Sequence, residues 1–248
     1  MSATPPGPFE LRVYFRGDVL GSPDTAVRLA ATLVEAGGEL APRELLGDLD
    51  AVEPLTPAAV RARFGAGPGP DALHMQGPGG VEAELHGYGP GLDPGSMLLF
   101  RVPFARLEGE GGGERVVSLA RALCGAFPPA YGWGHSADDV RLGDDPHRTK
   151  PWAEKRVYAA YWLTILGAPL VRTLKRAHVE ATPAHRVEVL PDGAALIVTT
   201  PSPAELLGPA AREAQSRALA HLAPERDAAK VLAELTARSE QLRSVAPA

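Results

Sequence analysis

The sequence predicts an α+β fold: a largely antiparallel sheet of about six to seven strands, with helices packed on one face of the sheet. Several segments alternate apolar and polar residues with a period of two, which is typical of half-buried strands. Two short turns, GPGG and PDG, each join a pair of such segments, and strands joined by a short turn run antiparallel. A doubly wound parallel sheet would need a helix between most successive strands.

The N-terminal part of the chain predicts one strand and two helices. FELRVYF, Phe9–Phe15, alternates strictly and is a half-buried strand. Ser22 is a suitable N-cap with Pro23 at the first helical position, and the helix that follows ends at Gly37–Gly38. A second helix begins at Thr56–Pro57 for the same reasons.

The middle of the chain predicts a hairpin, a central strand and a helix. Ala72–Gln76 and Val81–Tyr88 are the hairpin strands on either side of GPGG. Ser96–Phe104 is apolar on both faces, as a strand in the centre of a sheet is. The amphipathic helix Glu114–Phe127 holds the single cysteine, Cys124, which we interpret as a small buried hydrophobic residue.

A long helix is predicted over Trp152–Leu166. Tyr158, Trp162 and Ile165 follow the i, i+4, i+7 spacing of one helix face, which places Trp162 in the core. Gly167 ends this helix. The other elements expected here are a strand at 130–136, a polar loop at 137–151, a hairpin of HRVEVL and AALIVTT around PDG, and helices at 206–222 and 226–242.

These elements predict one main domain, at 9–222, preceded by a disordered N-terminus at 1–8 and followed by an additional C-terminal helix at 223–248. The net charge of −5 and the absence of a dense Lys/Arg run predict no direct binding to nucleic acid. The N-terminus has no signal-peptide pattern, and no apolar run is long enough to span a membrane. We therefore expect a cytoplasmic protein with no membrane segment.

The segment 131–162 concentrates the residues that could carry function. It contains all three tryptophans, three of the five tyrosines and four aspartates. Aromatic residues beside a charged loop are typical of interaction hot spots, and an acidic loop can occupy the basic cleft of a nuclease. We therefore predict a partner-binding surface made of six residues: Trp133, Asp138, Asp139, Asp144, Asp145 and Trp152.

An enzyme centred on the same loop, His135–His147, is the main alternative. Two histidines and four aspartates supply nitrogen and oxygen ligands there, but their spacing matches neither HExxH nor a calcium loop, so no metal or other cofactor is expected. His135 and Ser136 are neighbours on a strand and point to opposite faces, and GxSxG is absent, so no catalytic residue is predicted. A structural component of a secretion or phage-like apparatus is a third possibility.

Three segments carry a family resemblance: FPPAYGWGHS, then KRVYAAYWLTILGAPLV after the polar loop, then the hairpin VEVLPDGAALIVTT. In this order they resemble bacterial type VI and polymorphic-toxin immunity proteins, most closely the immunity protein 52 kind. The resemblance extends over roughly 9–222.

The resemblance implies a protein that is not an enzyme and that binds a cognate protein toxin, such as a nuclease effector, and neutralises it by stoichiometric occlusion. It supplies no catalytic residues. If the acidic loop does not bind the toxin, the strands between Val81 and Phe104 are the next surface to consider. The sequence predicts neither the toxin nor the oligomeric state.

Overall fold

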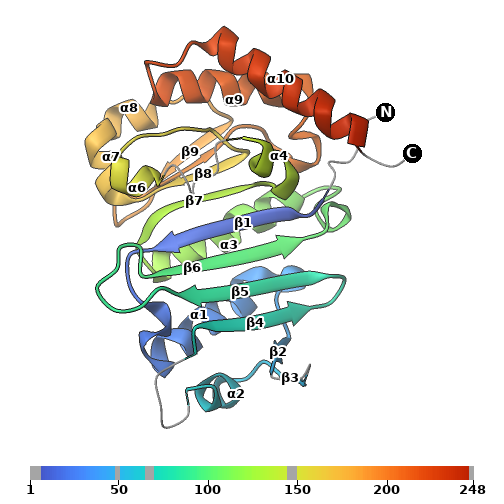
Figure 1. The fold of residues 1–248 in the computed structure, drawn as a ribbon, viewed down its shortest axis with the longest axis vertical. Coiled ribbons are helices and arrows are strands. Elements are labelled where there is room, and N and C mark those ends of the chain that lie inside the picture. Colours follow the sequence, from blue (N-terminus) through green and yellow to red (C-terminus); the bar gives the residue numbers. More distant parts are fainter. Residues whose placement is uncertain (1–6, 48–50, 65–69, 144–149, 246–248) are drawn as a thin grey trace.

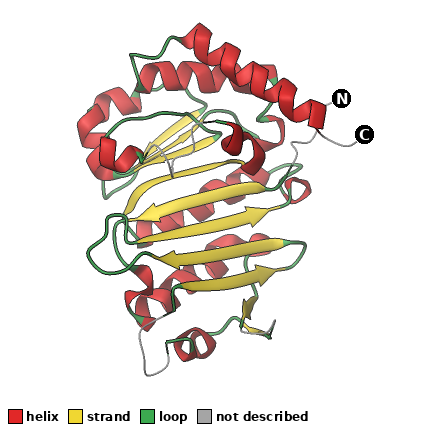
Figure 2. Ribbon diagram, in the orientation of Figure 1, coloured by secondary structure: helices red, strands yellow, loops and turns green. Residues whose placement is uncertain are grey.

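The computed structural model describes residues 7–47, 51–64, 70–143 and 150–245. They form one open antiparallel sheet of ten strands in the order β3-β2-β4-β5-β6-β1-β7-β8-β10-β9 (Figures 1 and 2). The strands are β1 (Phe9–Phe15), β2 (Glu44–Leu46), β3 (Val52–Pro54), β4 (Ala72–Gly77), β5 (Val81–Gly87), β6 (Ser96–Val102), β7 (Pro129–Ser136), β8 (Leu163–Leu166), β9 (Arg186–Val189) and β10 (Ala195–Val198).

Helices cover the sheet on both faces, which corrects the expectation that they lie on one. They are α1 (Pro23–Gly37), α2 (Pro57–Ala62), α3 (Gly112–Ala126), α4 (Ala137–Leu142), α6 (Pro151–Glu154), α7 (Ala168–Leu174), α8 (Arg176–Glu180), α9 (Pro209–Leu222) and α10 (Ala228–Val245). In Figure 1, α1 and α3 lie behind the sheet, whereas α4, α6, α9 and α10 lie in front of it and toward the end formed by β7 to β10.

Two hydrophobic cores result, one on each face. Alternate residues of β1 separate them: Leu11 and Val13 belong to the core under α1 and α3, and Tyr14 belongs to the core under α9 and α10. Both cores are built around the same central strands, so β6 and β7 are buried almost throughout. Ser96–Phe104 is apolar on both faces because both faces of this strand are buried. Helices on only one face of the sheet could not bury both.

The predicted helix Trp152–Leu166 is wrong. Helix α6 stops at Glu154, where Lys155 takes a left-handed backbone conformation with φ of 55°, and Leu163–Leu166 forms β8 between β7 and β10. Trp162 is buried in the core as predicted, but from a bend just before β8 and not from a helix. A short apolar run fits both helix and strand periodicity, and here the open edges of β7 and β10 supply the backbone hydrogen-bond partners that decide for a strand.

Three further elements differ from the sequence prediction. β2 and β3 have three residues each, too few to show a period of two, and together with β8 they raise the strand number to ten. The first part of the predicted polar loop forms α4, whose first turn is capped by the Ser136 hydroxyl accepting a hydrogen bond from the Asp139 N–H.

None of the helices in the described part of the chain combines the length and the apolar character that a membrane span needs.

The two predicted hairpins are present. β4 and β5 pair across Gly79 and Gly80, both at positive φ, and β9 pairs with β10 across the PDG turn. The C-terminal helix α10 packs along α9 and contacts α4, and its Leu235 is buried in the core beneath it. The N-terminal residues 1–6, most of the segment predicted to be disordered, lie outside the described residues.

Candidate functional site

Polar side chains gather on one face of β4, β5, β6 and β1, although Met97, Leu99 and Tyr14 on the same face are buried in the core. In Figure 1 no labelled helix lies in front of β4, β5 and β6. On β5, Val81, Ala83 and Leu85 are buried against the opposite face, and Glu82 and Glu84 point the other way. Residues directly across an antiparallel pair share a face, and Glu82, Arg101 and Glu10 stand opposite one another on β5, β6 and β1. We call this polar surface the open face.

Arg101 is the centre of an ion-pair ladder on the open face. Its Nη1 lies 2.7 Å from Glu84 Oε1 and 3.6 Å from Glu82 Oε2, and its Nε lies 3.4 Å from Glu10 Oε2. The other oxygen of Glu10 accepts a hydrogen bond of 2.7 Å from Arg12 Nη2. The pairs of Arg101 with Glu82 and Glu84 are partly exposed and contribute little to folding, whereas the Glu10 side chain is 5% exposed. The ladder fixes the positions of these charges on the face.

Glu84 also meets a histidine. His86 Nε2 lies 3.1 Å from Glu84 Oε2, and the rings of His86 and His74 make an edge-to-face contact across β4 and β5. Partial burial would raise the pKa of Glu84, but the hydrogen bond to His86 and the charge of Arg101 outweigh it and lower this pKa. Glu84 is therefore ionised on this surface at neutral pH.

A recess of about 260 Å³ lies where the open face meets α4. Its lining includes Glu10, Arg12, Arg101, Trp133 and Arg141. The Arg12 guanidinium lies over the Trp133 ring, 5.2 Å from the ring centroid, and the two residues stand opposite each other on β1 and β7. Arg12 Nε and Trp133 Nε1 are buried, and neither has a hydrogen-bond partner among the described residues. The two donors belong to residues that line the recess, but both atoms are shielded from solvent.

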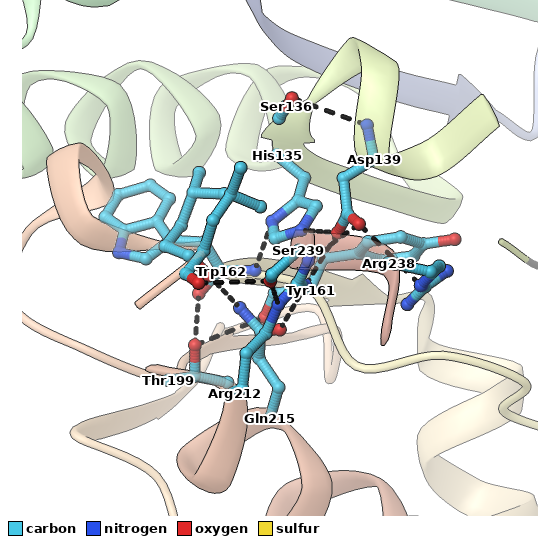
Figure 3. Close-up of polar contacts among 12 residues, drawn as sticks. His135, Ser136, Asp139, Tyr161, Trp162, Thr199, Arg212, Gln215, Arg238 and Ser239 are labelled. Atoms are coloured by element: carbon cyan, nitrogen blue, oxygen red, sulfur yellow. Dashed lines mark hydrogen bonds and ion pairs between the residues drawn. The ribbon is translucent and has the colours of Figure 1, made fainter. Parts of the chain in front are cut away.

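A buried polar network holds α4 beside this recess (Figure 3). Asp139, on α4, accepts hydrogen bonds of 2.7 Å from both Nη1 and Nη2 of Arg212, on α9. His135 Nε2, on β7, lies 2.6 Å from Asp139 Oδ2, and Arg212 Nε donates to Ser239 Oγ on α10 at 2.7 Å. We call these residues, with Gln215, which also accepts from Arg212, the His135–Asp139–Arg212 network.

The hydrogen bonds define the state of His135. Its Nδ1 accepts from the backbone N–H of Trp162 at 3.2 Å, so Nε2 carries the proton that Asp139 accepts, and the ring is neutral. Burial lowers the pKa of His135 and the nearby Arg212 and Arg238 lower it further, although Asp139 acts in the opposite direction. Burial would raise the pKa of Asp139, but its hydrogen bonds from His135 and Arg212 outweigh this and lower it far below the usual range.

The burial and the hydrogen bonding of the network indicate a structural role. His135, Asp139 and Arg212 are each 1% exposed, so no substrate reaches them in this conformation. Both oxygens of the carboxylate are bound by a guanidinium, and the neighbouring Ser136 hydroxyl caps α4. Within the described residues no three His, Cys, Asp or Glu side chains converge in a way that could hold a metal ion.

The four predicted partner-binding residues that the structure describes do not form one surface. Trp133 and Asp139 are each 1% exposed, so their side chains face the interior, which corrects their placement on a surface loop. Trp133 lies on the face of β7 that packs in the core under α9 and α10. Asp139 points inward from α4, where it pairs with Arg212. Asp138 lies near the recess and pairs with Arg141. Trp152 is half-buried against Tyr14, with ring centroids 4.5 Å apart.

Asp144, Asp145 and His147 lie outside the described residues. The sequence analysis did not single out Glu10, Arg12, Glu82, Glu84 or Arg101 as functional candidates. The signal was available in part: in FELRVYF the two charged residues occupy alternate positions of a strand, so they share one face. Which strands stand beside that face could not be read from the sequence.

Comparison with known proteins gives information on the fold alone. No protein-family model matches the chain, and no curated protein sequence matches it. Among solved structures, the chain is similar to the Pseudomonas aeruginosa T6SS protein PA0821, with a TM-score of 0.50 and 15% sequence identity over 97% of this chain and 86% of that chain. At this identity the likeness describes the shared architecture alone.

Proposed function

We propose that this protein is not an enzyme and acts as an immunity protein associated with a type VI secretion system, binding a cognate secreted toxin and neutralising it by stoichiometric occlusion. The observation that carries the proposal is the open face: a broad polar surface in the middle of the sheet, not covered by a labelled helix of the chain in Figure 1. The similarity in fold to a T6SS protein is compatible with such a role.

The open face has the properties of a rigid interaction surface. Its side chains stand on paired central strands, so their relative positions change little when a partner binds. Glu82 on β5 is exposed, and so is Glu44 on the neighbouring β2, which stands on the same face because it lies opposite Gln76. Both carboxylates can steer a partner of opposite charge. A nuclease toxin presents cations around its phosphate-binding cleft, so it is a suitable partner for this surface.

The buried network favours the same interpretation over the enzyme alternative. An acid–base pair in an enzyme must reach its substrate, and His135 and Asp139 are sealed between β7, α4 and α9. Elemental analysis of the dialysed protein checks the alternative independently. One tightly bound Zn or Mn ion per chain, lost in His135→Ala, would establish a metal site and argue for an enzyme centred on His135–His147.

The test of the proposal reverses charge on the open face. The variant is Glu44→Arg/Glu82→Arg, and the matched control is Glu35→Arg on the exposed side of α1, behind the sheet. Each variant is co-expressed with the secreted protein encoded beside this gene in a strain that the toxin kills. We expect both variants to keep the parental melting temperature, because exposed substitutions change stability by about 0.5 kcal/mol or less.

Only the open-face variant should lose protection, with association slowed at least ~10-fold at low salt. If it protects as well as the parent, the open face is not the interface. If no neighbouring gene encodes a toxic protein and the neighbours encode sheath, tube or baseplate components, the immunity function itself is wrong and the structural alternative is favoured.

A further inference from the structure

The sheet ends at β9, and the outer edge of this strand has no partner strand among the described residues. β9 pairs with β10 on one side only. The backbone groups of an unpaired edge can bind a further strand, and natural proteins often block such edges with Pro or Lys. At the other end of the sheet β3 finishes in Pro54, which has no N–H. β9 has the sequence RVEV and contains neither Pro nor Lys, so its edge is not blocked in this way.

The hydrogen bonds of the β9–β10 hairpin show which backbone groups point outward. In an antiparallel pair, residues whose backbone groups bond to the neighbouring strand alternate with residues whose groups point away from it. The Leu190 N–H donates to the Ala194 carbonyl at 2.8 Å, so the backbone groups of Leu190 point toward β10. By alternation, those of Val187 and Val189 point outward. Neither valine makes a backbone hydrogen bond beyond the β9–β10 pair in the parts of the chain that the structure describes.

The side chains of β9 alternate between the two faces of the sheet. The two valines pack against the core under α9 and α10. On the other face, Arg186 Nη1 donates to Glu114 Oε2 of α3 at 2.9 Å. Glu188 accepts hydrogen bonds of 2.7 and 2.9 Å from the guanidinium of Arg121, also on α3. The side chains of Arg186 and Glu188 remain 33% and 30% exposed, so both charges are accessible at the edge.

Backbone direction and charge together favour one register for pairing of β9 with a second copy of itself. Two copies related by a two-fold axis pair antiparallel, and outward positions must bond to outward positions. With Val187 opposite its own counterpart, Arg186 of each copy stands opposite Glu188 of the other, and opposite charges across a strand pair are stabilising. A shift of two residues in either direction would place two Glu188 or two Arg186 side chains opposite each other, and like charges there are destabilising.

We propose that two copies of this chain associate edge to edge through β9 and continue the sheet across a two-fold axis. The backbone groups of Val187 exchange their N–H···O=C hydrogen bonds with those of Val187 in the second copy, and an Arg186–Glu188 pair lies on either side. Four strands separate β9 from β6, so each copy keeps its open face for another partner. This association does not depend on the proposed function.

Sedimentation velocity of the full-length protein tests the association. A four-residue edge is a small interface, so we expect a reversible dimer whose share rises with protein concentration from the low micromolar to the submillimolar range. Val187→Pro removes the outward N–H but leaves the pairing with β10, because Pro is tolerated on an edge strand where the N–H faces away from the sheet. This variant should associate at least ~10-fold more weakly. A parent protein that stays monomeric throughout the range would overturn the proposal.

Two charge reversals test the register. Arg186→Glu places carboxylates opposite each other across the edge, and Glu188→Arg places guanidinium groups opposite each other. Each variant alone should therefore associate at least ~10-fold more weakly than the parent. An equimolar mixture of the two variants restores opposite charges at both positions, and we expect it to form heterodimers about as readily as the parent forms dimers. Both variants should stay folded, because the ion pairs that they break are partly exposed and contribute little to stability.

The matched control is Glu213→Arg, which breaks a similar exposed ion pair, with Arg217, on α9. It should associate as the parent does, and the melting temperature of each variant checks its folding. If the parent forms dimers but the mixture of the two reversals stays monomeric, the register is wrong. If Val187→Pro and both reversals form dimers as the parent does, the interface lies elsewhere and β9 is not the edge that pairs.

Discussion

The substitution Asp139→Asn tests the role of the buried network most directly. It keeps the size of the side chain and removes the charge that two guanidinium nitrogens of Arg212 bind at 2.7 Å. Arg212 is 1% exposed, so solvent cannot replace the lost carboxylate. Removing one partner of a buried ion pair costs roughly 3–5 kcal/mol because the other charge stays buried and unpaired.

The loss of stability in Asp139→Asn depends on the hydrogen bonds that asparagine can still make. Asparagine retains one acceptor oxygen for Arg212, but its NH₂ group faces donors, either the second Arg212 nitrogen or the Nε2–H of His135. We therefore expect a cost near the lower limit, ~3 kcal/mol. For a chain of this length one kcal/mol corresponds to ~2–4 °C, so the melting temperature should fall by ~6–12 °C.

The assay is urea unfolding followed by tryptophan fluorescence, with Asp138→Asn as the matched control. Asp138 precedes Asp139 on α4 but pairs with the exposed Arg141, so its loss should change stability by about 0.5 kcal/mol or less. The variant Arg212→Met and the double variant complete a cycle in which the coupling should exceed ~1.5 kcal/mol. A cost for Asp139→Asn that equals the cost for Asp138→Asn, or a coupling near zero, would refute the reasoning.

Two further predictions concern the same region. The pKa of His135 is lowered in the folded protein, so its contribution to stability is complete above the unfolded value of ~6.5 and is lost as the pH falls below it. Stability measured from pH 7.5 to 5 should therefore decline less in His135→Asn than in the parent, and an unchanged slope would contradict this. Trp162→Ala should lower the free energy of unfolding by ~3–5 kcal/mol, because the ring is fully buried, packs edge-on against Phe9 with centroids 5.6 Å apart and donates to the Thr200 carbonyl. A variant with the parental melting temperature would contradict this prediction.

Local patterns in the sequence were sufficient to predict the elements that depend on residues close together in the chain. The strand Phe9–Phe15, the caps Ser22 and Thr56, and the hairpin around GPGG all form where the sequence predicts them. Each depends on side-chain alternation, a hydroxyl near an N–H, or a turn residue, and these act within a few positions. Trp162 was assigned to the core by its size and apolar surroundings, which hold whatever the backbone conformation.

The tertiary structure decided everything that depends on a distant partner. Leu163–Leu166 became a strand because β7 and β10 lie on either side of it, although its own spacing fits a helix. Asp139 left the predicted acidic surface because Arg212, 73 positions later, needs its carboxylate inside the protein. Composition and periodicity therefore determined that this chain is a mixed α and β protein with a sheet core. A local pattern carries no information about pairings between residues far apart in the sequence. Such pairings decide the strand order, the helices on both faces and the recess of Arg12 and Trp133.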